Sequence, residues 1–310
     1  MGLGIICTGQ GNQNGGMFSG LANYSQLDAQ LNVLSKRLGC EILPQIALGN
    51  ECLFGNQYAQ PLIASLTFLQ WQLLKDELEL PVAFAGYSLG ELSAYACSGA
   101  CDFMTLLDLA QTRANLMNKA AQQSAESGLL AVSGLPQRVL TNLIQEHGCY
   151  LAIVNAPDSC VLGGIKINLQ HLGSKIMQSY PMAKLTELKV ELASHTPVLS
   201  AASVEFEEYL AQQMWQPLSA PIIASIDNQV IYAAKDGLGS LSRQISETIY
   251  FSRTIQIMYE LGASVILELG SGKSLSAIVN NLQLPLKVRS FNDFNNVTGV
   301  IQWVQKNLRT

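Results

Sequence analysis

Residues 86–90 read Gly-Tyr-Ser-Leu-Gly, which places Ser88 between two glycines. The apolar run "PVAFAGYS" leads into Ser88, and "GELSAYACSGA", with the small and apolar residues of a packed helix, follows it. A strand that turns sharply into a helix lifts a serine hydroxyl out of the sheet and points the helix N-terminus at it. The pattern is typical of a serine nucleophile, although a lone G-x-S-x-G also occurs in ordinary loops.

A serine nucleophile needs a base, and the chain has three histidines. His147 stands just before a glycine that ends a predicted helix, and His171 is predicted to face solvent on another. His195, in "LASHTP", lies in a loop held by Pro197, where two predicted domains meet. Elimination therefore favours His195 as the base.

Arg113 lies in "AQTRANLM", inside an otherwise apolar helical stripe. A solvent-facing arginine with its stem along the surface is the usual arrangement. The alternative is a guanidinium fork that binds a carboxylate in a dry pocket. The spacing of residues leaves both interpretations open.

Two glycine-rich segments could suggest a nucleotide site, but neither has the required spacing. In "TGQGNQNGGMF" (8–18), Asn14 stands where G-x-G-x-x-G needs its third glycine. In "GSGKS" (270–274), the first glycine of a P-loop would fall on Leu267. We therefore exclude ATP binding, and the first segment could instead aim backbone N–H groups at an oxyanion.

The composition indicates a folded, cytoplasmic protein with a large core. The chain has 310 residues, of which 48% are apolar and 13% charged, and its net charge of −5 without a basic block argues against nucleic acid as a partner. An odd count of seven cysteines without C-x-x-C favours reduced thiols over disulfides or a metal site. No apolar run reaches the ~18 residues of a membrane span, and the N-terminus lacks the pattern of a signal peptide.

The order of predicted elements changes near residues 125 and 191. Between them the order is β-α-β-β-α-β, the ferredoxin-like arrangement, whereas strands and helices alternate on both sides, as in a mostly parallel sheet. We therefore predict an α/β fold with two parts. An α/β-hydrolase-like large domain covers 1–124 and 192–310, and a ferredoxin-like small domain covers 125–191.

Three helices of the large domain are predicted in enough detail to compare with the structure. One covers 60–78, with Pro61 in its first turn. The second covers 102–123, and Asp102 could cap it. The third runs across 240–250.

Together these segments resemble the malonyl-CoA:acyl-carrier-protein acyltransferase family over nearly the whole chain. Several short motifs in family order are far more specific than any one of them. The segments that carry the resemblance are "TGQGNQNGGMF", "QYAQPLIAS", "GYSLGELSAYACSGA", "QTRANLM", "VNAPDSCVLGG", "LASHTPVL", "RQISETIYFS" and "ILELGSGKSL".

The resemblance implies a role for each of five residues. Ser88 would be the acylated nucleophile and His195 its base, while the backbone N–H groups of Gln10 and Leu89 would form the oxyanion hole. Arg113 would pair with the free carboxylate of a malonyl group.

The resemblance also implies supporting residues and ligands. The main-chain carbonyl of Gln244 would orient the histidine, and Asn155 and Gln60 would lie near the pocket. Malonyl-CoA would be the substrate and the phosphopantetheine thiol of an acyl carrier protein the acceptor, with no metal and no tightly bound cofactor. Methylmalonyl stays open as the acyl group.

Three positions depart from the common family pattern. Tyr87 stands where many relatives have histidine, and Thr8 and Thr248 stand where many have proline. Tyr87 and the pair Cys7-Thr8 are similar to the epsilon subunit of malonate decarboxylase, which would add other subunits of that complex as partners. The transacylase of fatty acid biosynthesis is the alternative.

Two other classes share parts of this site. A serine esterase or thioesterase would lose its acyl group to water, and a non-catalytic subunit of a carrier complex would form no acyl-enzyme. Carrier proteins are usually acidic, so Lys184 and Lys189 are candidates for contacting one.

Overall fold

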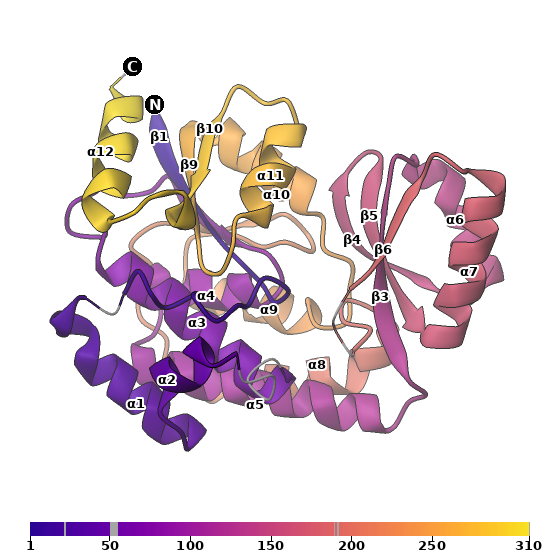
Figure 1. Ribbon diagram of the computed structural model, residues 1–310, viewed down its shortest axis with the longest axis horizontal. Helices are drawn as coiled ribbons and strands as arrows, with labels where there is room; N and C mark the ends of the chain where they lie inside the picture. Colours follow the sequence, from indigo (N-terminus) through magenta and orange to yellow (C-terminus); the bar gives the residue numbers. More distant parts are fainter. Residues whose placement is uncertain (22, 50–54, 189, 191, 310) are drawn as a thin grey trace.

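The computed structural model describes residues 1–310 except 22, 50–54, 189, 191 and 310. Figure 1 shows two lobes, a larger one around a six-stranded sheet and a smaller one around a four-stranded sheet. Both chain termini lie at the same end of the larger lobe (Figure 1). The chain therefore leaves the larger lobe and returns to it, as the element order predicted.

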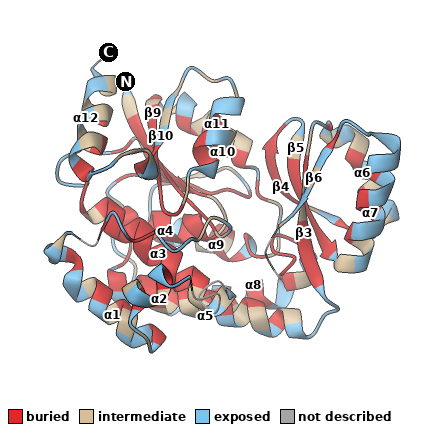
Figure 2. Ribbon diagram, in the orientation of Figure 1, coloured by how far each residue is buried: buried red, intermediate tan, exposed pale blue. Residues whose placement is uncertain are grey.

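The six-stranded sheet is parallel except at one edge. Its order is β10-β9-β1-β2-β7-β8, and only β7 and β8 pair antiparallel. Its strands β1, β2 and β9 are almost wholly buried, as expected for a sheet covered on both faces (Figure 2). The strands are β1 (Gly2–Cys7), β2 (Ala83–Gly86), β7 (Ile222–Ile223), β8 (Val230–Ile231), β9 (Ala263–Leu269) and β10 (Lys287–Ser290).

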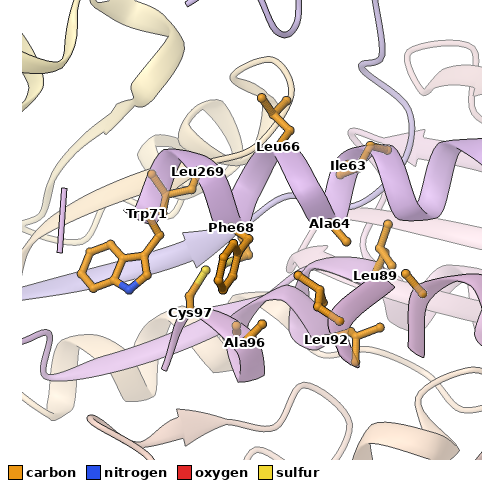
Figure 3. Close-up of a cluster of buried hydrophobic side chains, with 14 of the residues drawn as sticks. Ile63, Ala64, Leu66, Phe68, Trp71, Leu89, Leu92, Ala96, Cys97 and Leu269 are labelled. Carbon is orange, nitrogen blue, oxygen red and sulfur yellow. The ribbon is translucent and has the colours of Figure 1, made fainter. Parts of the chain in front are cut away.

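Helices cover this sheet and fix the turn after β2. In Figure 3, Leu89 and Leu92 of α4 lie in the same apolar cluster as Ile63 and Phe68 of α3. Leu89 directly follows Ser88, so core packing anchors that turn. The helices are α1 (Asp28–Leu38), α2 (Ile42–Ala47), α3 (Asn56–Gln72), α4 (Leu89–Cys97), α5 (Phe103–Gln122), α8 (Ser200–Ala211), α9 (Leu238–Arg243), α10 (Phe251–Glu260), α11 (Ser274–Asn281) and α12 (Val297–Leu308).

None of the helices that the structure describes is long and apolar enough to cross a membrane.

The four-stranded sheet has the predicted ferredoxin-like topology. Its order is β4-β5-β3-β6, all neighbours are antiparallel, and two helices cover its outer face (Figure 1). Apolar side chains from this sheet and both helices form a separate core. The elements are β3 (Ser127–Ser133), α6 (Gln137–Glu146), β4 (Tyr150–Ala156), β5 (Ser159–Ile165), α7 (Lys166–Ser179) and β6 (Lys184–Glu187).

A segment of the larger lobe that was predicted to be helical forms backbone hydrogen bonds with the four-stranded sheet. The prediction of a helix across 240–250 is wrong in its second half, because α9 ends at Arg243. Ile249 instead pairs with β4: its N–H donates to the Ala152 carbonyl at 3.0 Å, and its carbonyl accepts from the Val154 N–H at 2.8 Å. The strand β4 thus provides hydrogen-bond partners for the backbone N–H and carbonyl of Ile249, which in a helix would bond to residues four positions away.

Helix α3 also begins earlier than predicted. It starts at Asn56, so Pro61 lies inside the helix and not in its first turn. The extra turn is held by the Asn56 amide, which donates to the Ala114 carbonyl at 3.1 Å and to Asn118 Oδ1 at 2.9 Å. The predicted cap of α5 is confirmed, since Asp102 Oδ1 accepts the backbone N–H of Thr105 (2.8 Å).

Candidate active site

Ser88 lies at the turn from β2 to α4 in a strained backbone conformation. Its φ is 55° and its ψ is −121°, a region that a residue with a side chain rarely adopts. A Cβ on Gly86 would lie 1.9 Å from the backbone nitrogen of Glu91, and one on Gly90 would lie 1.9 Å from the carbonyl oxygen of Cys7. The two glycines are therefore required for the turn that presents the Ser88 hydroxyl.

Two hydrogen bonds to backbone carbonyls, one from the His195 N–H and one from its ring, hold His195 against Ser88. Its φ is 62°, and its N–H donates to the carbonyl of Ile245 at 2.8 Å. Nδ1 lies 2.6 Å from the carbonyl oxygen of Gln244, and Nε2 lies 2.8 Å from Ser88 Oγ. Because a carbonyl can only accept, Nδ1 carries the proton and Nε2 accepts the Ser88 hydroxyl.

The electrostatics of this pair favour a neutral imidazole. Burial, and to a smaller extent the positive charge of Arg113, lower the pKa of His195 to about 3. The ring is therefore unprotonated on Nε2 at neutral pH and can take the proton of Ser88.

The turns after β1 and β2 bring two backbone donors to the same edge of the sheet. Cys7 pairs with Gly86 in the parallel register, and the Tyr87 N–H donates to the Cys7 carbonyl at 3.0 Å. Leu89 is the first residue of α4, so its N–H has no acceptor within the helix. Within the described residues, neither this group nor the N–H of Gln10 donates a hydrogen bond.

Arg113 is buried in α5 and does not face solvent. Only 1% of its surface is exposed. Its Nη1 donates to Gln60 Oε1 at 2.9 Å and its Nη2 to Gln244 Oε1 at 3.3 Å. Burial lowers the pKa of Arg113 to about 10, so the group stays charged at pH 7. No carboxylate among the described residues forms an ion pair with it, which leaves a desolvated cation that can bind one.

Gln60 and Asn155, both named from the sequence, lie on two sides of this region. Gln60 is fixed by Asn56, whose Oδ1 accepts its amide at 2.7 Å. Asn155, on β4, hydrogen-bonds the hydroxyl of Tyr87, whose pKa burial raises to about 12. The Tyr87 ring packs edge-on against Phe251 with centroids 5.1 Å apart. The residue before the nucleophile therefore contacts both the four-stranded sheet and helix α10 of the larger lobe.

Sequence reasoning missed two groups beneath the nucleophile. The resemblance gave Gln244 a role only through its main-chain carbonyl, yet its side chain donates to the Ser88 carbonyl at 3.0 Å and to Glu91 Oε2 at 2.9 Å. Glu91 is fully buried and was not singled out at all. Its only signal was that an acidic residue stands in the apolar run that follows the Ser88 turn.

The remaining sequence candidates lie outside this cluster. His147 ends α6, with Nδ1 2.8 Å from the Leu143 carbonyl, and His171 is exposed on α7. Lys184 is exposed on β6, and Lys189 lies outside the described residues, so carrier docking there stays a prediction. No cluster of three or more metal-binding side chains occurs in the described ranges.

Known proteins resemble this chain along almost its full length. It is 28% identical over 285 residues to the polyketide biosynthesis malonyl CoA-acyl carrier protein transacylase BaeC of Bacillus velezensis, covering 89% of this chain and 94% of the relative. It is 25% identical to the malonyl CoA-acyl carrier protein transacylase of Haemophilus influenzae, covering 97% and 98%.

Solved structures agree with the fold. The crystal structure of MCAT from Streptococcus pneumoniae superposes with a TM-score of 0.86 at 26% identity, covering 98% of this chain and 99% of the other. The malonyl-CoA:acyl carrier protein transacylase of Helicobacter pylori has a TM-score of 0.91 at 24% identity, with 99% of both chains covered. The acyl transferase domain matches residues 5–281. The chain belongs to the acyl transferase domain family.

Proposed function

We propose that this protein transfers a malonyl group from malonyl-CoA, through an ester on Ser88, to the phosphopantetheine thiol of an acyl carrier protein. The observation that carries the proposal is the buried Arg113, held by two neutral amides beside the Ser88–His195 pair. A desolvated guanidinium that forms no ion pair with the described residues selects an acyl group that brings its own carboxylate. The names of the relatives point to the same substrate and acceptor.

In the first half-reaction, Ser88 Oγ attacks the thioester carbonyl of malonyl-CoA while its proton passes to His195 Nε2. The N–H groups of Gln10 and Leu89 stabilise the oxyanion of the tetrahedral intermediate. The C–S bond then breaks, and His195 returns the proton to the departing CoA thiolate. His195 Nδ1 keeps its proton and donates a hydrogen bond to the Gln244 carbonyl throughout, which stabilises the transient imidazolium.

The second half-reaction repeats these steps with a different nucleophile. The carrier's thiol gives its proton to His195 Nε2 as its sulfur attacks the acyl-serine, and the proton returns to Ser88 Oγ when the ester bond breaks. Arg113 holds the malonyl carboxylate in both halves, so an acetyl group would lack that contact. No metal or tightly bound cofactor enters any step.

The proposed function also suggests a role for each of the two domains and a compartment for the reaction. We propose that 1–124 and 192–310 form the catalytic large domain, and that 125–191 form a small domain that borders the pocket through Asn155. The cysteine pattern fits a reducing compartment, so we propose that the reaction takes place in the cytoplasm.

The identity of the acceptor is a finer proposal. Tyr87 and Cys7-Thr8 support a role as the epsilon subunit of malonate decarboxylase, with its dedicated carrier and other subunits as partners. The names of the sequence relatives described above support an acyl carrier protein outside that complex instead, and one of these relatives is named for polyketide biosynthesis.

Intact mass measured after brief mixing with malonyl-CoA tests the proposal directly. We expect a malonyl-sized adduct that persists as long as no acceptor is added, is absent from Ser88→Ala, and is weak with acetyl-CoA. Addition of each candidate carrier should then discharge the adduct and identify the acceptor. Free CoA that accumulates without an adduct would instead indicate a hydrolase, and neither adduct nor CoA release would indicate a non-catalytic subunit.

A further inference from the structure

Glu91 is a buried carboxyl group that the proposed mechanism does not use. It lies in the first turn of α4, three residues after the nucleophile, and none of its surface is exposed. Its Oε2 accepts from the N–H of Ser225 at 3.0 Å, from the Ser225 hydroxyl, and from Gln244 Nε2 at 2.9 Å. A carboxyl group this deeply buried is costly, so its presence calls for a local reason.

The contact with Gln244 determines which way that side-chain amide faces. Gln244 Nε2 donates to two oxygens, Glu91 Oε2 and the Ser88 carbonyl, and its Oε1 accepts from Arg113 Nη2. With the amide reversed, its oxygen would face those two acceptors and its NH₂ group would face a guanidinium that only donates. Glu91 therefore favours the single orientation in which Gln244 can hold Arg113.

Gln244 is also the point where the reacting groups meet. Its backbone carbonyl lies against His195 Nδ1, its side chain holds the carbonyl of Ser88, and its Oε1 is one of the two acceptors that hold Arg113. A tilt of this amide would move the guanidinium relative to the hydroxyl that attacks the thioester. Misplacement of a substrate-binding group by about 1 Å can cost ~100-fold in rate.

We propose that Glu91 is a positioning residue for malonyl selectivity: by fixing the Gln244 amide, it holds the Arg113 guanidinium where the carboxylate of a malonyl group on Ser88 can reach it. This inference rests on the proposed function. The positioning depends on the reach of the Glu91 acceptor oxygen. The charge of Glu91, which raises the pKa of Arg113 against the larger effect of burial, is not needed for the contact with Gln244. Burial raises the pKa of Glu91 to about 7, and the oxygen that faces Gln244 can accept whether or not the group is ionised.

Two conservative variants separate reach from charge. Glu91→Asp keeps the charge but withdraws the acceptor by one methylene, whereas Glu91→Gln keeps the reach and removes the charge. The measured quantity is the ratio of the second-order rate constants for acylation of Ser88 by malonyl-CoA and by acetyl-CoA, followed by intact mass. We expect the ratio to fall at least tenfold in Glu91→Asp, through malonyl alone, and to stay within about threefold of wild type in Glu91→Gln.

Glu268 provides a matched control. It is equally buried, and its carboxyl group accepts from the N–H groups of Leu275 and Ser276 and from the Ser276 hydroxyl, none of which belongs to the site. Glu268→Asp should lower the thermal midpoint but keep the malonyl-to-acetyl ratio within twofold. In a Gln244→Ala background, Glu91→Asp should not lower the ratio further, because the amide that it positions is gone.

Several outcomes would overturn the inference. These are an unchanged ratio in Glu91→Asp, an equal loss in Glu91→Asp and Glu91→Gln, or a loss with both acyl-CoAs alike. Failure of the proposed function is distinguishable, since wild-type protein would then form no malonyl adduct at all. If wild type discriminates between the two acyl-CoAs and Glu91→Asp does so equally, only the role of Glu91 is wrong.

Discussion

The neighbouring helices α4 and α5 begin in opposite ways. Asp102 caps α5 from an extended backbone, and its carboxylate accepts the Thr105 N–H, which lowers the pKa of Asp102. Ser88 occupies the same position on α4 with φ at 55°, makes no side-chain cap, and turns its hydroxyl to His195 Nε2. One helix start is arranged for stability and the other for presenting a side chain.

The difference shows how a candidate site can be recognised from the backbone. A missing cap costs about 1 kcal/mol, and a strained φ at a residue with a side chain costs about 1–3 kcal/mol. Such a conformation persists only where the surroundings fix it, and the buried Leu89 together with the two glycines does so here. His195, with φ at 62°, shows the same strain on the other side of the hydrogen bond.

The largest expected effect comes from removing the presented hydroxyl. Ser88→Ala should abolish the acyl-enzyme and lower CoA release at least ~10⁴-fold. Its free energy of unfolding should stay within about 1 kcal/mol of wild type, because the hydroxyl caps nothing. Intact mass, CoA release and urea denaturation measure the three quantities. A loss of several kcal/mol would mean that the hydroxyl holds α4 after all, and the contrast with Asp102 would disappear.

The next effect concerns the middle of α5, where Arg113 lies far from the cap. Arg113→Ala should slow acylation by malonyl-CoA by the equivalent of about 2–5 kcal/mol, the range for truncating one partner of a buried charge pair. Acylation by acetyl-CoA should change little. Arg113→Lys, which lacks the planar fork, serves as the charge-matched control and should recover only part of the selectivity. Equal losses with both acyl-CoAs would remove the carboxylate-binding role.

Acid should lower the stability contributed by His195, which pairs with Ser88 at the start of α4, and by Asp102, at the start of α5, in different pH ranges. The pKa of His195 is about 3 in the folded protein and about 6.5 when unfolded, so the unfolded chain binds more protons between these values. The stability contributed by His195 is fully present above pH ~6.5 and is lost as the pH falls towards 3. The lowered pKa of Asp102 acts in the same direction, but only below about pH 4.

Urea denaturation from pH 8 to pH 4.5 measures this separation. As the pH falls, the free energy of unfolding of wild type should decrease relative to that of His195→Asn. The difference between wild type and Asp102→Asn should stay constant. The malonylation rate should also show no loss near pH 6.5 that belongs to His195. A half-point for that rate near 6.5 that persists in Glu91→Gln, and is absent from a reference thiol ester reaction, would contradict a depressed histidine pKa.

The smallest effect is expected at the ordinary cap. Asp102→Ala should lower the free energy of unfolding by about 1 kcal/mol, and Asp102→Asn, which can still accept the Thr105 N–H, by less. The rate of malonyl transfer should stay within about twofold of wild type in both. A large loss of activity would show that the start of α5 also controls the site.

Local sequence pattern was enough for much of the fold. The ferredoxin-like order and the start of α5 were readable because periodicity, turn residues and caps act within a few positions. The early start of α3 and the extended segment at Ile249 were not, because their partners lie on α5 and β4. Hydrogen bonds to residues distant in the sequence therefore determine both the start of α3 and the extended conformation at Ile249.

The candidate site divides in the same way. Ser88 and His195 stood out by residue type and local context, and the structure brings them to 2.8 Å. The contact between Gln244 and Glu91 spans 153 positions, and that between Arg113 and Gln60 spans 53, so no local pattern signals either. Glu91 could have been noticed only as an acid in an apolar run.

The pairing of Ile249 with β4 has a practical consequence for enzyme engineering. The segment from Gln244 to Ile249 runs from the histidine's acceptor to the edge of the second sheet, and His195 is itself tied to Ile245. A chimera that exchanges only 125–191 with a relative would place a foreign strand edge against a native catalytic segment. Exchanges that also include 244–250 should preserve the backbone pairing of Ile249 with β4 and give active hybrids more often.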